Sequence, residues 1–438
     1  MNSLPLDFIK RIQADTFVAD TLLAALEQTA PTSVRLHPER NATFEHSSPV
    51  PWNPNGLYLD QRPAFTYDPL FHAGAYYPQE AGSMYLTQVL QTIALPQNPV
   101  ILDLSAAPGG KSTLIASFLK HRGVLIANEI NRSRAYILSE NLSKWGYSNV
   151  FVCNHKPSEL SVLHGQIDVL VVDAPCSGEG MFRKDHQARA EWNIANANAC
   201  AERQTNIIND VWPLLKEGAF LIYSTCTFNP DENEQQLQKL IKEGAAAKVQ
   251  LPVFDGMKPD RSQIGYYFFP DQIKTEGFYI AALQKTEPNT RQSKPKKTQL
   301  QQGLPSDLAQ DLTFANDLHF WQEDGKVFAS TSFAMELFRQ IKNLKFLKTG
   351  VHIATANKKW TPGYDMVYSL QIHWNLPLKN VELKEALQIL HGESHQWVAE
   401  AGFYYVVYQG QKIALIKQIG QRFNNLHPNE WRIRHLPK

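Results

Sequence analysis

The chain has 438 residues and a formal net charge of +1, with 43% hydrophobic and 19% charged residues. This length predicts two or three domains, and the composition is that of an ordinary soluble protein. The near-neutral charge gives no global argument for nucleic acid, so any surface that binds nucleic acid must be local.

The four cysteines are few and scattered. They lie at Cys153, Cys176, Cys200 and Cys226, with no CxxC pair. This arrangement excludes a disulfide framework and gives no zinc motif, so we expect no metal and a reducing, cytoplasmic location. The N-terminus has charges where a signal peptide has its apolar core, and no run of about 18 apolar residues predicts a membrane span.

The first 92 residues predict an extension that precedes the main core. Apolar residues recur at helical spacing over residues 5–30, which predicts one or two amphipathic helices before Pro31. TSVRLHPER then predicts a short strand, and prolines preclude regular helix up to about residue 78. The helical pattern returns from about Gln79.

A strand, a small-residue loop and a helix follow one another in PVILDLSAAPGGKSTLIASF. The strand covers residues 100–104 and the helix begins near Lys111, so backbone N–H groups and a helix N-terminus face a ligand. The Walker pattern fails because Ser105 stands where its first glycine is required. Glu129 ends the next strand, where a carboxylate can hold ribose hydroxyls. These features indicate an adenosine-containing ligand without a triphosphate.

Strands and helices then alternate along the chain. This alternation over residues 93–285 predicts a doubly wound parallel sheet of the α/β class. The expected elements are a helix over 133–145, strands ending at Cys153 and Asp173, a helix over about 197–216, a strand ending at 225–226 and a last strand over 277–283.

The stretch DVLVVDAPCSGEGMFRK, from Asp168 to Lys184, is where we expect the chemistry. Asp173 ends a buried strand, at the edge where open α/β sheets bind ligands. Cys176 and Cys226 both follow strand ends and converge on Lys111, and a nearby ammonium group lowers the pKa of a thiol. Each residue alone also fits a packed turn or a small buried hydrophobe.

The C-terminal third divides into a linker and two small domains. Residues 286–303 are polar and lysine-rich and predict a linker. Residues 304–375 mix short patterns, and residues 376–438 contain the strand-like runs FYYVVYQ and KIALIKQI. From position 410 onward a basic excess fits phosphate binding or a solvated face, with six Lys and Arg against Glu430, namely Lys412, Lys417, Arg422, Arg432, Arg434 and Lys438.

The motifs YYPQEAGSM, DLSAAPGGKS, DAPCSGEGMFRKD and YSTCTFNPDENE, in this order, resemble the NOL1/NOP2/Sun family of RNA 5-methylcytosine methyltransferases, and most of all its bacterial RsmF type. The resemblance covers roughly residues 1–285, and GFYYVVYQGQKIALIKQIG resembles the PUA-like RNA-binding module that ends such enzymes. It implies a Rossmann-like, S-adenosylmethionine-dependent methyltransferase core with PUA-like RNA-binding sequence behind it. The implied substrate is 16S ribosomal RNA, free or in the 30S subunit, and we expect a monomer.

The resemblance also assigns roles to residues. Cys226 is the implied nucleophile toward C6 of cytosine, and Cys176 the residue that assists release. Asp173 is implied to face both cofactor and base, with Lys111 assisting. The implied cofactor-binding residues are Ala106, Ala107, Pro108, Gly109, Gly110, Lys111, Glu129, Asp173 and, in place of an aspartate that many relatives have after NVFVC, Asn154.

Two other readings compete. Cys176 is the nucleophile if the chain works like DNA 5-methylcytosine enzymes, but the Thr-Cys motif at 225–226 argues against this. A methyltransferase fold that has become a ribosome assembly factor is disfavoured because Lys111, Asp173 and both cysteines are intact. Since every expected catalytic residue precedes the linker, we also expect a chain truncated near Lys285 to fold and residues 304–438 to supply RNA affinity.

Overall fold

The computed structural model describes residues 3–289, 293 and 298–437. Most of the charged part of the predicted linker, residues 290–292 and 294–297, lies outside the described residues, as does Lys438 of the basic excess. No helix within the described ranges is both long and apolar enough to cross a membrane.

The N-terminal extension forms two amphipathic helices and a small antiparallel sheet. The predicted helices over residues 5–30 are present, and each buries its apolar residues on one side. The sheet has the order β2-β3-β1-β4. The elements are α1 (Leu6–Ala14), α2 (Thr21–Leu26), β1 (Thr32–Leu36), β2 (Ser47–Pro49), β3 (Gly56–Leu59), η1 (Phe65–Tyr67), α3 (Pro69–His72), β4 (Tyr76–Pro78), η2 (Gly82–Tyr85) and α4 (Leu86–Thr92).

A ten-stranded mixed sheet forms the centre of the molecule, with the order β11-β12-β13-β9-β8-β5-β6-β7-β18 and β10 beside β13. The five strands from β9 to β7 are parallel, as predicted. Their order reverses between β5 and β8, which is where sheets of this kind bind ligands. The strands are β5 (Val100–Asp103), β6 (Val124–Asn128), β7 (Val150–Cys153), β8 (Ile167–Asp173), β9 (Leu215–Thr225), β10 (Ala246–Lys248), β11 (Lys258–Pro259), β12 (Gly265–Phe268) and β13 (Phe278–Lys285).

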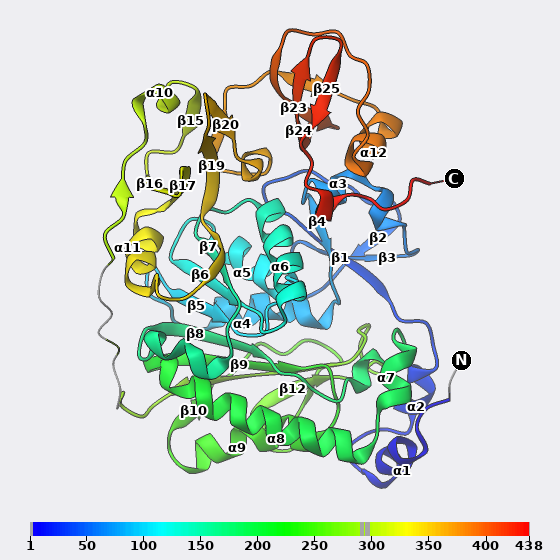
Figure 1. The fold of residues 1–438 in the computed structure, drawn as a ribbon. Helices are drawn as coiled ribbons and strands as arrows, with labels where there is room; N and C mark the ends of the chain where they lie inside the picture. The colour runs from blue at the N-terminus through cyan, green and yellow to red at the C-terminus, as the bar shows by residue number, and fades with distance from the viewer. Residues whose placement is uncertain (1–2, 290–292, 294–297, 438) are drawn as a thin grey trace.

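Helices cover both faces of this sheet, which confirms the doubly wound architecture (Figure 1). One apolar cluster packs α4, α5 and α6 against one face. Another packs α1, α2, α8 and α9 against the other face. The further helices of this core are α5 (Gly110–Leu119), α6 (Arg132–Trp145), η3 (Pro157–Leu163), η4 (Glu179–Met181), α7 (His186–Glu191), α8 (Ile194–Val211), η5 (Trp212–Leu214), η6 (Pro230–Glu232) and α9 (Glu234–Lys242).

The region after the linker shares a sheet with the core. Strand β18 pairs antiparallel with β7 and so extends the central sheet by one strand. Trp321, Phe338 and Leu344 belong to the same apolar cluster as Phe151 and Cys153 of β7. We therefore revise the expectation that a chain truncated near Lys285 keeps its fold, because truncation would uncover the β7 edge and this packing.

Residues 301–374 form two further small sheets beside the core, with the orders β14-β16-β17-β19-β20 and β15-β21. The elements are β14 (Gln301–Gln302), α10 (Ser306–Ala309), β15 (Leu312–Phe314), β16 (Leu318–Glu323), β17 (Lys326–Thr331), α11 (Ser332–Ile341), β18 (Phe346–Thr349), β19 (Val351–Ala356), β20 (Trp360–Pro362), η7 (Tyr364–Val367) and β21 (Ile372–Trp374).

The C-terminal module is a four-stranded sheet with one helix, and both predicted strands are present in it. Its core includes Ala73 beside α3, so the module also packs against the N-terminal extension at the top of Figure 1. The elements are β22 (Leu378–Asn380), α12 (Leu383–His391), β23 (Gly402–Tyr408), β24 (Gln411–Ile419), β25 (Arg422–Asn425) and η8 (Asn429–Trp431).

Candidate active site

The two predicted cysteines meet at the carboxyl ends of β8 and β9. These strands are parallel neighbours with Asp173 opposite Ser224, so the residues that follow each strand emerge side by side. The Sγ atoms of Cys176 and Cys226 lie 3.2 Å apart. The structure thus places both thiols in one site, as the sequence predicted.

The surroundings of the Cys176 thiol raise its pKa. Its hydrogen bond with Cys226 and its burial raise the pKa of Cys176 well above the ordinary value, and the negative charge of Glu232 acts in the same direction. At neutral pH Cys176 is therefore a neutral thiol, able to donate a hydrogen bond to the sulfur of Cys226.

Lys111 and Asp173 form an ion pair beside the cysteines. The Lys111 Nζ atom lies 2.8 Å from Oδ2 of Asp173, and the Ser224 hydroxyl donates to Oδ1 of the same carboxylate at 2.8 Å. Burial alone would lower the pKa of Lys111, but the Asp173 carboxylate raises it above its ordinary value, so the ammonium group stays charged. The Lys111 ammonium group also interacts electrostatically with Cys226.

Two side chains of α6 donate hydrogen bonds to the loop that precedes α5. Gly109 has a φ of 120°, a conformation that side chains strongly disfavour, and Gly110 begins the helix. The Arg134 guanidinium donates to the Ala107 carbonyl at 2.7 Å, and Asn141 donates to the Pro108 carbonyl at 2.8 Å. The predicted loop therefore has a fixed shape at the N-terminus of α5.

Glu129 and Asn154 lie beyond the ends of β6 and β7. Glu129 is buried, and Oε1 of its carboxylate accepts from the backbone N–H of Asn131 at 2.9 Å. The side-chain amide of Asn154 donates to the carbonyls of Glu129 and Ile130. Asn154 thus braces the loop that carries Glu129, and only its carbonyl oxygen is left for a contact with adenosine.

Asp103 is a site residue that the sequence did not single out. It is fully buried at the end of β5, and its Oδ2 accepts from the Ser112 hydroxyl at 2.6 Å. Burial raises the pKa of Asp103 to about 7. Its Oδ1 is buried without a hydrogen-bond partner among the described residues, and such atoms are rare in native proteins unless a ligand completes them.

This edge of the sheet fits S-adenosylmethionine. Glu129 offers a carboxylate to ribose hydroxyls, and the N-terminus of α5 suits the carboxylate of the methionine part. Oδ1 of Asp103, which has no hydrogen-bond partner among the described residues, suits the ammonium group of the methionine part. No group of three or more His, Cys, Asp or Glu in the described ranges is arranged to hold a metal ion.

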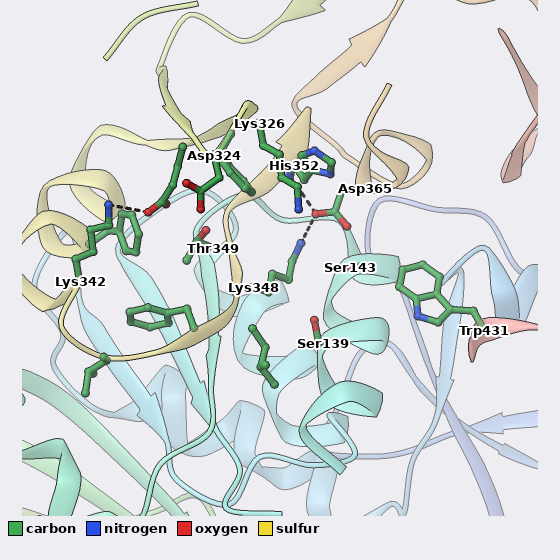
Figure 2. A pocket seen from close by; sticks show the side chains of 16 residues that line it. Ser139, Ser143, Asp324, Lys326, Lys342, Lys348, Thr349, His352, Asp365 and Trp431 are labelled. Carbon is green, nitrogen blue, oxygen red and sulfur yellow. Dashed lines mark hydrogen bonds and ion pairs between the residues drawn. The ribbon is translucent and has the colours of Figure 1, made fainter. Parts of the chain in front are cut away.

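A pocket of about 500 Å³ lies elsewhere, between α6, β18 and the β16–β17 hairpin (Figure 2). Its charged side chains largely pair with one another: Lys342 with Glu323 at 2.7 Å and Lys348 with Asp365 at 2.7 Å. It contains neither cysteine, and its size alone gives it no chemical role. The reaction site is therefore assigned from the chemistry of its groups.

Two buried glutamates next to the cysteines were also missed. Glu179 follows Cys176, and Glu232 follows Cys226. In sequence each stands in a loop rich in Gly, Asn or Pro, where a carboxylate fits an ordinary turn. No pattern in one sequence distinguishes a surface turn from a buried one here.

Models of three protein families match most of the chain. The model described as 16S rRNA methyltransferase RsmB/F matches residues 90–284. The model for the N-terminal domain of 16S rRNA methyltransferase RsmF matches residues 4–81, and the model for the methyltransferase RsmF PUA domain matches residues 380–433. The three matches follow the order of the extension, the core and the C-terminal module.

Whole relatives and solved structures agree with these matches. The ribosomal RNA small subunit methyltransferase F of Enterobacter sp. (strain 638) is 30% identical over 419 residues, which cover 87% of this chain and 84% of the relative. The protein of the same name from Erwinia tasmaniensis is 29% identical, with the same coverage of both chains.

Two solved structures from Pyrococcus horikoshii share the fold. A methyltransferase homolog is 25% identical with a TM-score of 0.53, covering 64% of this chain and 98% of its own. NSun6, solved with SFG, is 21% identical with a TM-score of 0.56, covering 65% of this chain and 99% of its own. These likenesses support the methyltransferase fold of the core.

Proposed function

Because the chain belongs to the RsmF family of 16S rRNA methyltransferases, we propose that it methylates C5 of a cytidine in 16S ribosomal RNA through a covalent bond to Cys226. The enzyme depends on S-adenosylmethionine, which supplies an electrophilic methyl group when it is bound. The observation that carries the proposal is the 3.2 Å contact between the Cys176 and Cys226 sulfurs beside the Lys111–Asp173 ion pair.

Cys226 is the nucleophile in this proposal. C5 of cytosine does not react with an electrophile until a nucleophile has added to C6, because only then does C5 carry the electron density of an enamine. The Cys226 thiolate, beside the Lys111–Asp173 ion pair, forms the C6–S bond and leaves the electron pair on C5. The base must leave the helical stack to reach a site this deep.

Asp173 stabilises the base while the bond forms. Its carboxylate is held by Lys111 and Ser224, so it is oriented before the substrate arrives. Addition of the thiolate to C6 puts negative charge on the ring, and a proton taken up from solvent at N3 neutralises it. The fixed Asp173 carboxylate accepts hydrogen bonds from N3–H and N4–H of this protonated ring, and such preorganised groups lower the barrier. Residues 106–111 and Glu129 hold the cofactor on the other side, with Asn154 bracing Glu129.

Cys176 assists the final step. The C5 proton leaves to solvent, its electron pair forms the C5–C6 double bond, and the C6–S bond to Cys226 breaks. The sulfur departs with a negative charge, which the protonated Cys176 thiol stabilises by donating a hydrogen bond across 3.2 Å. This role explains why two cysteines, rather than one, occupy the site.

Bisulfite sequencing of ribosomal RNA tests the reaction and its target together. Cells that lack the gene should lose protection of at least one 16S cytidine, and the wild-type gene should restore it. The Cys226→Ala gene should not, although the purified variant should still bind S-adenosylmethionine in calorimetric titration, because the thiol acts on the base alone. An unchanged protection pattern in the deletion strain would refute the proposed target.

A further inference from the structure

Glu179 receives hydrogen bonds from three separate parts of the chain. It lies in η4, and its side chain is 0% exposed. The Trp192 indole donates to Oε1 at 3.1 Å, while the Phe228 backbone N–H and the Arg11 guanidinium donate to Oε2 at 3.0 and 2.7 Å. One buried carboxylate thus joins the Cys176 loop, the segment after Cys226 and the N-terminal helix α1.

The residue after Glu179 holds the same segment from the other side. The backbone N–H of Gly180 donates to the carbonyl of Cys226 itself at 2.8 Å. A Cβ atom on Gly180 would lie 2.4 Å from the Gly277 carbonyl, so the loops pack too closely here for any larger residue. Glu179 and Gly180 together fix the backbone on both sides of position 227.

Glu232 makes the reciprocal connection. It follows Cys226 in the chain, and its carboxylate accepts from the backbone N–H of Ser177 at 2.7 Å and from the Ser177 hydroxyl at 2.6 Å. Each cysteine loop therefore carries a glutamate that binds the backbone of the other loop. This arrangement resists any change in the separation of the two sulfurs.

The ion-pair partner of Glu179 lies on α1. Within the described part of the chain, Arg11 is the one cation that forms an ion pair with Glu179. Helix α1 is fixed there because Phe8 packs on Phe182 and Trp192, with ring centroids 5.1 and 5.5 Å apart. Removing one partner of a buried ion pair leaves an uncompensated charge, which strongly destabilises the local arrangement.

We propose that Arg11 and Glu179 are positioning residues, through which the N-terminal helix α1 sets the placement of Cys226 relative to Cys176. The inference rests on the proposed function, since it gives the two cysteines their roles. Without Arg11, the buried carboxylate must recruit water or another donor, which would shift the Phe228 backbone and with it Cys226. A misplacement of about 1 Å can cost on the order of 10²-fold in rate.

The decisive variant is Arg11→Met, which keeps a long apolar stem and removes the charge. We expect turnover on ribosomal RNA to fall between about 10-fold and about 10²-fold. The KM for S-adenosylmethionine should stay within about twofold, because the cofactor loop lies on other elements. Arg11→Lys should restore most of the turnover. Lys10→Met is the matched control, since Lys10 is 65% exposed on the same helix and should leave turnover unchanged.

A second measurement needs no RNA and separates this inference from the proposed function. The rate at which iodoacetamide alkylates Cys226, followed by peptide mass spectrometry across a pH series, reports the surroundings of the thiol. Arg11→Met should move this pH profile, while Arg11→Lys and Lys10→Met should follow the wild type. If wild-type protein fails to methylate RNA, the proposed function falls, yet the alkylation profile still decides the role of Arg11.

Trp192→Phe covers the case in which Arg11→Met fails to fold. It keeps an aromatic ring against Phe8, although a smaller one, and removes the N–H that binds Oε1 of Glu179. We expect the same loss of turnover and the same direction of change in the alkylation profile. Wild-type turnover and a wild-type profile in a folded Arg11→Met protein, or in Trp192→Phe where the former does not fold, would overturn the inference.

Discussion

At the scale of single residues, the site places a charged ion pair close to a neutral thiol. The Asp173 carboxylate raises the pKa of Lys111, which stays charged, whereas Cys176 stays neutral because it is buried against Cys226 and near Glu232. In the proposed mechanism, the charged pair acts while the C6–S bond forms, and the neutral thiol acts while that bond breaks. Two substitutions separate these tasks.

We expect Cys176→Ala to accumulate a covalent adduct between protein and RNA. Attack by Cys226 is intact in this variant, but the hydrogen-bond donor to the departing sulfur is gone, so release is slowed. Denaturing electrophoresis with radiolabelled 16S RNA measures the adduct. The Cys176→Ala/Cys226→Ala protein is the control and should show none, whereas an adduct that needs Cys176 and ignores Cys226 would reverse the two roles.

Asp173→Asn should lower turnover by about 10²–10³-fold, because it removes a preorganised charge that acts on the transition state. The unfolding midpoint should change far less than turnover. Lys111 loses its carboxylate partner, but Asp173 is partly exposed and Asn keeps an oxygen for the Ser224 hydroxyl. Single-turnover methyl transfer and thermal unfolding measure the two effects. A variant with wild-type turnover would show that Asp173 only ends its strand.

The sequence was informative about residues where several signals converged. Asp173, Cys176, Cys226 and Lys111 each followed a strand or preceded a helix, so the parallel-sheet prediction alone brought them to one edge. Asp103 stands at the end of β5, but the carboxylate oxygen that has no partner among the described residues is visible only in the structure. Glu179 and Glu232 carry no signal of this kind. Their importance depends on burial, and burial depends on contacts with α1 and with neighbouring loops that are distant in sequence.

At the scale of elements, the same distinction separates the core from β18. The five parallel strands are continuous apolar runs, which predict a buried sheet directly. Strand β18 has four residues, two of them polar, and pairs with β7 across a long stretch of chain that includes the linker. A strand of four residues is too short to show an alternation of apolar and polar residues. The sequence therefore does not indicate that β18 is a strand or that it pairs with β7.

The shared sheet makes a prediction about stability. Phe338 on α11 is 2% exposed and its ring centroid lies 5.6 Å from that of Phe151 on β7. Phe338→Ala should therefore destabilise the core by about 3–5 kcal/mol. Phe333→Ala on the same helix is the control, since Phe333 is 37% exposed and should cost within about 0.5 kcal/mol.

Denaturant unfolding, followed both by circular dichroism and by binding of S-adenosylmethionine, distinguishes one cooperative unit from two. If Phe338→Ala shifts both signals to the same lower midpoint, residues 304–375 fold together with the methyltransferase core. A shift in circular dichroism with an unchanged midpoint for cofactor binding would instead restore the independent core that the linker suggested.

At the scale of the whole molecule, the N-terminal extension contacts every other part. Its Arg11 reaches the cysteine loops, and its Arg35 donates to the Gly110 carbonyl and the Thr113 hydroxyl beneath the cofactor loop. Arg40 donates to the carbonyls of Lys144 and Tyr368, which joins α6 to the region after the linker. The core of the C-terminal module includes Ala73 of the extension. The extension thus contacts both the module and the cysteine loops, so RNA bound by the module should be presented to the site.

The remaining prediction concerns how the molecule binds RNA. Lys417 on β24 and Arg422 on β25 are exposed on the C-terminal module, within the basic excess that the sequence showed. Changing both to Ala should weaken binding of 16S RNA. Each lost phosphate contact should also lower the slope of log affinity against log salt by roughly 0.7–0.9, because fewer counterions are released.

The matched control changes Lys239 and Lys242 to Ala. Both are exposed on α9, at the end of the molecule opposite the C-terminal module (Figure 1), so the same total charge is removed far from it. Affinity is measured at several salt concentrations for all three proteins. A flatter slope in the Lys417 and Arg422 variant alone places phosphate contacts on the module. Equal slopes in both variants and the wild type would mean that the excess is a solvated face, and that the methyltransferase core and its extension bind the RNA by themselves.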